Sequence, residues 1–184
     1  MNREKFTGER FVPGIQDEAL TIEHVQRYES IGKIISGKNV LDAACGEGYG
    51  SRILSDYALN VTGLDISEET INNARYNYRN IDNLKFVHGS IAQIPLENNS
   101  IDIVVSFETI EHVTEELQRS FLAEVSRVLK EDGFLIISTP NKEIYSERYN
   151  YHNEFHIKEF YEKEFVDFLK GYFKNIRLFY QFFE

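Results

Sequence analysis

Tryptophan is absent from the 184 residues, cysteine and methionine occur once each, and no apolar run approaches the roughly 18 residues of a membrane-spanning helix. The single cysteine, Cys45, cannot close an intrachain disulfide bond, and the polar N-terminus lacks the apolar stretch of a signal peptide. We therefore expect a protein of the reducing cytoplasm that does not insert into a membrane.

Basic residues are also scarce, because 20 Lys and Arg stand against 30 Asp and Glu, a formal net charge of -10. A protein that neutralises phosphates needs the opposite balance, so nucleic acid is not expected as a partner. The length and the 42% of apolar residues suffice for one domain with a real core. We predict a single domain over residues 18–184, preceded by a polar arm or lid over residues 1–17.

Apolar strands and amphipathic helices alternate along the chain. A first helix is expected over about residues 18–35 and a last one over about 161–172, with a strand-like segment after it at 175–183. Strands are expected within 39–46, 61–65, 84–90, 101–107 and 133–139, and Ser67 is expected to cap the helix after the second. The alternation predicts a doubly wound, Rossmann-like α/β fold, a mostly parallel sheet with helices on both faces. Ligands of such folds bind at the carboxyl ends of the strands.

The first strand ends in a glycine-rich turn that runs from Asp42 through Gly46, Glu47 and Gly48. Glycine allows positive φ angles and lets a ligand approach the backbone closely. Asp65 ends the second strand, where a carboxylate can accept hydrogen bonds from both ribose hydroxyls of a nucleoside. These residues predict a cofactor that contains a nucleoside.

The charges in this turn bear on the kind of cofactor. A pyrophosphate near Glu47 and Asp42 would be repelled by roughly 3 kcal/mol per charge pair at about 6 Å and an effective dielectric of about 20. A cofactor that carries a sulfonium and an ammonium meets no such penalty. Ser51 also replaces the third glycine of the dinucleotide-binding pattern. An NAD-linked oxidoreductase is therefore the less favoured alternative.

Four segments in order resemble the motifs of class I S-adenosylmethionine-dependent methyltransferases, over roughly residues 18–180. They are VLDAACGEGYGS, GLDIS, HGSIAQIPLENNSIDIVVSFETIEHV and EVSRVLKEDGFLIISTPN. The segments FTGERFVPG, HVQRY and NEFHIKEF are similar to bacterial methyltransferases associated with glycan and cell-surface polysaccharide biosynthesis. The resemblance implies S-adenosylmethionine as cofactor and a small molecule or a sugar as acceptor.

The resemblance also implies roles for individual residues. Gly46 and Gly48 approach the methionine part of the cofactor, Asp65 holds the ribose, and Ile66 packs against adenine. An Arg or Tyr of the first helix binds the cofactor carboxylate; alternatively, that Tyr is a core residue and the Arg is solvated. The full set of expected cofactor-binding residues is Arg27, Tyr28, Asp42, Gly46, Glu47, Gly48, Asp65, Ile66, Ser90, Ile91 and Phe107.

The acceptor should meet the methyl donor after the fourth strand, where Glu111 and His112 follow one another. Either could take the proton of a hydroxyl acceptor, and His156 is the alternative base. Their structural alternatives are a first-turn glutamate and a helix-capping histidine. A divalent metal at Glu108, Glu111 and His112, as in some ubiquinone-type O-methyltransferases, stays open, and we assign no metal site.

The sequence thus predicts an S-adenosylmethionine-dependent O- or N-methyltransferase. The other alternative is a cofactor-binding module without catalysis, part of a larger glycan-assembling protein. Class I methyltransferases finish with a hairpin of two strands, whereas one strand-like segment precedes Glu184. We therefore expect an incomplete hairpin: a truncated chain, a non-standard sheet edge, or an edge completed by another chain, as in a homodimer.

Overall fold

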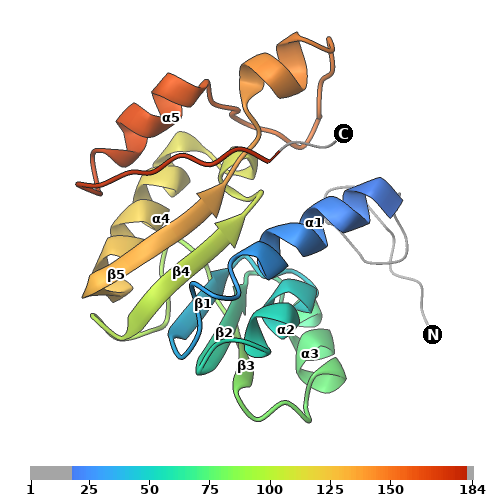
Figure 1. The fold of residues 1–184 in the computed structure, drawn as a ribbon, viewed down its shortest axis with the longest axis vertical. Helices are drawn as coiled ribbons and strands as arrows, with labels where there is room; N and C mark the ends of the chain where they lie inside the picture. Colours follow the sequence, from blue (N-terminus) through green and yellow to red (C-terminus); the bar gives the residue numbers. More distant parts are fainter. Residues whose placement is uncertain (1–17, 182–184) are drawn as a thin grey trace.

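The computed structural model describes residues 18–181, which form one sheet with helices packed on it (Figure 1). The strands are β1 Asn39–Ala43, β2 Asn60–Asp65, β3 Leu84–His88, β4 Ile101–Phe107 and β5 Leu129–Ser138. The helices are α1 Glu18–Ser30, α2 Tyr49–Ser55, α3 Glu68–Asn77, α4 Glu115–Val128 and α5 Glu162–Leu169. Single turns of 3-10 helix and π-helix lie at Ile110–His112 and Glu143–Glu147. The predicted arm or lid at residues 1–17 lies outside the described residues.

The five strands are all parallel and stand in the order β3-β2-β1-β4-β5. The order reverses between β1 and β4, which creates a crevice at their carboxyl ends. The predicted doubly wound α/β fold is confirmed, although the strand expected within 133–139 begins earlier, at Leu129. The loops after β1, β2 and β4 therefore meet at one edge of the sheet, where the sequence placed the site.

Alternate residues of the central strands face two separate hydrophobic layers. Val40 of β1 and Ile103 of β4 pack with Tyr28 of α1 and Leu54 of α2. On the opposite face, Leu41 and Val104 pack with a row from α4 and α5: Phe121, Leu122, Val125, Val128 and Leu169. Since side chains alternate across a strand, burial on both faces requires the near-continuous apolar run seen in β4.

The ends of the helices agree with the local sequence signals, with one correction. Ser67 Oγ accepts a hydrogen bond from Thr70 N at 3.3 Å, so the predicted cap of α3 is confirmed. The first helix, predicted to about residue 35, ends at Ser30 instead. Gly32 follows, and a Cβ atom there would lie 2.8 Å from the ring of Tyr57, so only glycine fits at this position. Glycine has a low helix propensity, which favours the end of the helix here.

The predicted strand after the last helix is wrong for the part that the structure describes. Residues 174–181 carry no strand and return from α5 toward α1 (Figure 1). Ile176 packs against the core on the α4 face, and the side chain of Gln181 bonds to Arg27 and to the carbonyl of Glu23. Aromatic residues raise β propensity, but a strand also needs a paired neighbour, which this segment does not take.

Candidate active site

The turn after β1 combines backbone strain with open space. Ala44, Gly46 and Gly48 have φ angles of 65°, 53° and 80°, a region that residues with a Cβ atom rarely adopt. A Cβ atom at Gly48 would lie 2.6 Å from the ring of Phe86, whereas one at Gly46 would meet no atom of the described residues within 4 Å. Gly48 is thus required by packing, and Gly46 leaves the outer side of the turn accessible to a ligand.

Asp65, at the end of β2, is fixed beside this turn. Its Oδ2 accepts a hydrogen bond from Gly46 N at 3.0 Å, and its Oδ1 accepts one from Ser67 N at 2.9 Å. A carboxylate in this position, at the end of the second strand, is the group that accepts the ribose hydroxyls in nucleoside-binding folds of this class. The next residue, Ile66, is 67% exposed at the same edge. The predicted ribose and adenine residues therefore lie next to the predicted methionine-binding turn.

Asp42 lies beneath the turn and is fully buried. Its carboxylate accepts hydrogen bonds from Ser51 Oγ at 2.6 Å and from the Tyr28 hydroxyl at 3.4 Å. Burial raises the pKa of Asp42 to about 7, against the lowering effect of these two bonds. A Cβ atom at Gly50 would lie 2.1 Å from the Tyr28 ring, so the ring packs under the first turn of α2. Tyr28 occupies a core position, as the structural alternative predicted, but the same alternative expected a solvated Arg27 and is wrong there, because that side chain is only 17% exposed.

The raised pKa of Asp42 predicts how stability depends on pH. Between about pH 4 and 7 the folded protein keeps a proton that the unfolded chain has released, so the free energy of unfolding should fall as pH rises through this window. The total loss in the free energy of unfolding is roughly 4 kcal/mol, and it is complete above about pH 7. Asp42→Asn should lack it, and urea unfolding of both proteins at pH 5 and pH 8 measures the difference. Equal pH dependence in the two proteins would contradict the prediction.

The side chain of Arg27 in α1 extends to the residue that follows β4. Its Nη1 lies 3.7 Å from Glu108 Oε1, and its Nε donates to Gln181 Oε1 at 2.7 Å. Among the described residues, Nη1 is buried with no hydrogen-bond partner. The guanidinium therefore has a donor available for an anionic group at this edge. Phe107 lies nearby, with its ring centroid 4.9 Å from that of Tyr28.

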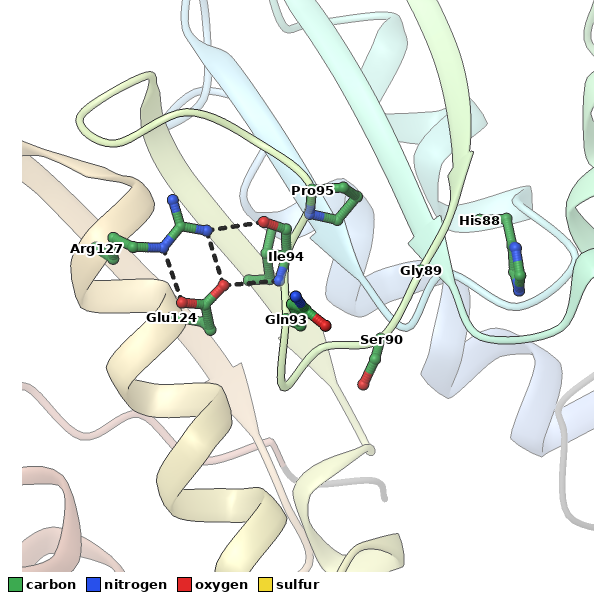
Figure 2. A pocket seen from close by; sticks show the side chains of 8 residues that line it. All are labelled: His88, Gly89, Ser90, Gln93, Ile94, Pro95, Glu124 and Arg127. Carbon is green, nitrogen blue, oxygen red and sulfur yellow. Dashed lines mark hydrogen bonds and ion pairs between the residues drawn. The ribbon is translucent and has the colours of Figure 1, made fainter.

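The loop after β3 is fastened to α4 by a pair of charged residues. Figure 2 shows the Glu124 carboxylate and the Arg127 guanidinium both reaching the backbone at Ile94. Glu124 Oε2 accepts from Ile94 N at 2.7 Å, and Arg127 donates to the carbonyls of Ile94 and Leu96 at 2.8 Å each. The pair borders a hollow of about 540 Å³ that Ser90 also lines. Ile91, the other predicted adenine-edge residue, is partly buried against the core.

Loss of Arg127 should loosen this loop. Arg127→Leu leaves the Leu96 carbonyl without its side-chain donor and the Ile94 carbonyl with only the Leu96 amide as donor, and we expect the free energy of unfolding to fall by about 1–3 kcal/mol. Hydrogen exchange of the Ile94 amide should become faster. The matched control is Arg119→Leu on the same helix, whose pair with Glu115 is exposed, so urea unfolding should show a much smaller loss than in Arg127→Leu. Equal losses in the two variants would refute the assignment.

The three predicted catalytic residues meet beyond the end of β4. Glu111 and His112 lie in the 3-10 turn, and the ring centroids of His112 and His156 are 4.9 Å apart. The segment that carries His156 is tied to this turn, because the amides of Ile157 and Lys158 both donate to the Glu111 carbonyl. His156 therefore lies beside Glu111 and His112 in the fold, although it is 44 residues from His112 in the chain.

Each member of this cluster is held by a neighbour that the sequence reasoning missed. Glu111 is fully buried, and its Oε2 accepts from Thr139 Oγ1 at 2.9 Å. Burial, and next the charge of Glu108, raise the pKa of Glu111 to about 8. His156 Nδ1 lies 2.6 Å from Glu159 Oε1. Because these two polar residues are three positions apart, their contact could have been predicted from the sequence. Thr139 offered no such signal, since its contact depends on the path of the loop after β5.

The order of the sheet, the glycine turn after β1 and the carboxylate after β2 define a Rossmann-like domain built to bind a nucleoside-containing ligand. Residues 41–137 match the family model described as "Methyltransferase domain". The chain belongs to this methyltransferase domain family, which confirms the resemblance to class I methyltransferases at that level.

The similar proteins agree with this assignment. A protein of Mycolicibacterium smegmatis named "Probable S-adenosylmethionine-dependent methyltransferase" is 37% identical over 89% of this chain and 63% of its own length. A protein of Mycobacterium tuberculosis with the same description is 33% identical over 89% of this chain and 58% of its length. The chain therefore spans less than two thirds of these relatives. The YcgJ protein of Bacillus subtilis shares the fold, with a TM-score of 0.68 at 21% identity, over 81% of this chain and 67% of that one.

The names of these relatives support S-adenosylmethionine as the cofactor. The narrower resemblance to glycan-associated methyltransferases is not tested by them. Among residues 18–181, no helix is long and apolar enough to cross a membrane.

Proposed function

We propose that this domain binds S-adenosylmethionine at the carboxyl edge of its sheet and transfers the methyl group to a hydroxyl or amine. The observation that carries the proposal is the meeting of the glycine turn, the Asp65 carboxylate and the Glu111, His112 and His156 cluster at one edge. The first two fit a nucleoside, and the third lies where an acceptor would receive the methyl group.

The cofactor would lie with its methionine part over the turn and its nucleoside toward β2 and β3. Asp65 would accept the ribose hydroxyls, Ile66 would pack on adenine, and the loop of Ser90 and Ile91 would border the adenine edge. Glu47 lies in the turn itself, so its charge favours a cationic sulfonium over a pyrophosphate. Arg27 Nη1, which has no hydrogen-bond partner among the described residues and only a 3.7 Å ion pair with Glu108, suits the cofactor carboxylate.

Methyl transfer is an in-line displacement in which a lone pair of the acceptor attacks the methyl carbon. The carbon–sulfur bond breaks, its electron pair returns to sulfur, and S-adenosylhomocysteine leaves. Alignment of the reacting atoms supplies much of the rate. A hydroxyl must also lose its proton, and a base placed in reach contributes about 10²–10⁴-fold. The His112 Nδ1 proton is donated to the Phe155 carbonyl at 3.0 Å, which leaves Nε2 as the basic nitrogen.

Aromatic side chains line the approach to this cluster and suit a ring-shaped acceptor. The ring of Tyr145 stacks on His156 with centroids 5.5 Å apart, and Tyr151 packs edge-on against Tyr145 at 5.4 Å. Apolar faces of a sugar pack on such rings. A small glycan-type acceptor is therefore our proposal, together with a cytoplasmic location for the enzyme.

The proposal is tested by incubation with S-adenosylmethionine and panels of sugars, sugar nucleotides, small alcohols and amines, with S-adenosylhomocysteine as the readout. We expect product with at least one acceptor and a loss of about 100-fold or more in His112→Asn, whose fold is checked by circular dichroism. Cofactor binding without turnover on any acceptor, unchanged by His112→Asn, would instead indicate a non-catalytic module. Stronger stabilisation by NAD than by S-adenosylmethionine would indicate an oxidoreductase.

A further inference from the structure

Three groups of the cluster beyond β4 are close enough to bind one ion. One ligand atom each from Glu111, His112 and His156 lie within 4.8 Å of one another. They come from the 3-10 turn after β4 and from the segment before α5, which the backbone bonds to the Glu111 carbonyl hold together. Proximity alone does not make a metal site, so the orientation of each group decides.

Both imidazoles are oriented as metal ligands are. His112 Nδ1 lies 3.0 Å from the Phe155 carbonyl, which only accepts, so Nδ1 carries the proton and Nε2 the lone pair. His156 Nδ1 lies 2.6 Å from the Glu159 carboxylate, which fixes the same tautomer, and its Nε2 accepts from Asn153 Nδ2 at 3.0 Å. Metal-binding histidines nearly always donate their second nitrogen to a carbonyl or a carboxylate in this way.

The third group is a buried carboxylate with an unused oxygen. Glu111 Oε2 is bonded to Thr139, whereas Oε1 is buried, has no hydrogen-bond partner among the described residues, and lies 3.9 Å from His112 Nε2. A buried carboxylate without a cation or a full set of donors is energetically costly. A cation held between the three groups would remove this cost.

We propose that Glu111 Oε1, His112 Nε2 and His156 Nε2 hold a divalent transition-metal ion, with zinc as the first candidate. Two imidazoles and one carboxylate form a common donor set of open zinc sites, which leaves a fourth position for a substrate oxygen. Asn153 would give up its bond to His156 when the ion binds. This set of ligands contains His156 in place of Glu108, which the sequence had suggested together with Glu111 and His112. Glu108 Oε1 instead accepts a hydrogen bond from Ser138 Oγ at 2.6 Å and faces Arg27.

The role of the ion rests on the proposed methyl transfer. An acceptor hydroxyl in the fourth position would have its pKa lowered, lose its proton to water, and attack the methyl carbon as an alkoxide while the carbon–sulfur bond breaks toward sulfur. The imidazoles would then hold the ion and not take the proton. The ring of Tyr145, stacked on His156, would line the acceptor side of the site.

The test uses the full chain stripped of metal with a chelator. We expect one Zn²⁺ per chain by calorimetry, a rise in the unfolding temperature on adding Zn²⁺, and visible absorption bands of tetrahedral coordination on adding Co²⁺. Glu111→Gln and His156→Asn should each lower Zn²⁺ affinity by at least about 100-fold, and Glu159→Gln, which keeps all three ligands, by about 10–100-fold. The control is His152→Asn, an exposed histidine four residues from His156, which should bind Zn²⁺ like the parent.

Absence of Zn²⁺ and Co²⁺ binding at micromolar concentration, or equal binding in the parent and in all four variants, would overturn the proposal. Calorimetry with S-adenosylmethionine on the same metal-free protein separates the two claims. Cofactor binding without metal binding refutes the metal site alone, whereas metal binding without cofactor binding supports the site and refutes the proposed function.

Discussion

Replacing Asp65 with alanine is expected to lower the affinity for S-adenosylmethionine by about 100-fold or more. The carboxylate lies beside the glycine turn, where it would accept two ribose hydroxyls through charge-assisted bonds of roughly 1.5–3 kcal/mol each. Its removal also releases the Gly46 and Ser67 amides that it holds. Asp65→Asn keeps one acceptor oxygen and should lose less affinity, about tenfold. Calorimetric titration measures both.

Asp102→Ala is the matched control for this prediction. The Asp102 carboxylate also accepts from a backbone amide, that of Asn39 at 2.8 Å, and it pairs with Lys130. Asp102 lies near the beginning of β4, at the end of the strands opposite to the candidate site, so its loss should leave cofactor affinity unchanged. Equal affinity in Asp65→Ala and Asp102→Ala would remove Asp65 from the cofactor site.

Gly46→Ala should mainly lower cofactor affinity, whereas Gly48→Ala should mainly lower stability. Both glycines have positive φ angles, so each substitution strains the backbone by roughly 1–2 kcal/mol. At Gly46 the new methyl group meets no atom of residues 18–181 within 4 Å and would occupy the space proposed for the cofactor, so Gly46→Ala should fold and lose at least about tenfold in cofactor affinity. At Gly48 the methyl group collides with Phe86, so Gly48→Ala should mainly lose stability.

Urea unfolding and calorimetry on the two variants separate these effects. Gly37→Ala is a control for the backbone strain alone, because Gly37 has a φ of 71° and a Cβ atom there would meet no described residue within 4 Å. Gly37 precedes β1, so it lies at the end of the sheet opposite to the candidate site. If Gly46→Ala binds S-adenosylmethionine as tightly as Gly37→Ala does, the outer side of the turn is not where the cofactor lies.

The fold could be predicted from the sequence because its signals are local. The apolar run Ile101–Phe107 becomes β4 with the predicted bounds, and Ser67 caps α3 as its position indicates. Two of the corrections concern non-local effects. The first helix ends early where the ring of Tyr57 packs over Gly32, and the segment after Lys174 does not pair with a neighbouring strand.

The candidate site was predictable to a lesser degree. Parallel strands bring their carboxyl ends to one edge, so the nearness of Asp65 to Gly46 follows from the fold class. The contact between His112 and His156 does not follow from any period, because it depends on an irregular segment after β5 that folds back over the 3-10 turn. Phe155, whose carbonyl bonds to His112, belongs to the same segment and was missed for the same reason, whereas the i,i+3 spacing of Glu159 from His156 was a local signal in the sequence.

The most direct test of the central claim is a calorimetric titration of the purified chain with S-adenosylmethionine and with S-adenosylhomocysteine. The site described at the edge of β1 and β2 predicts that both bind with one molecule per chain, and that Asp65→Ala loses this binding while Asp102→Ala keeps it. No binding of either compound at millimolar concentration to the folded protein would contradict the account.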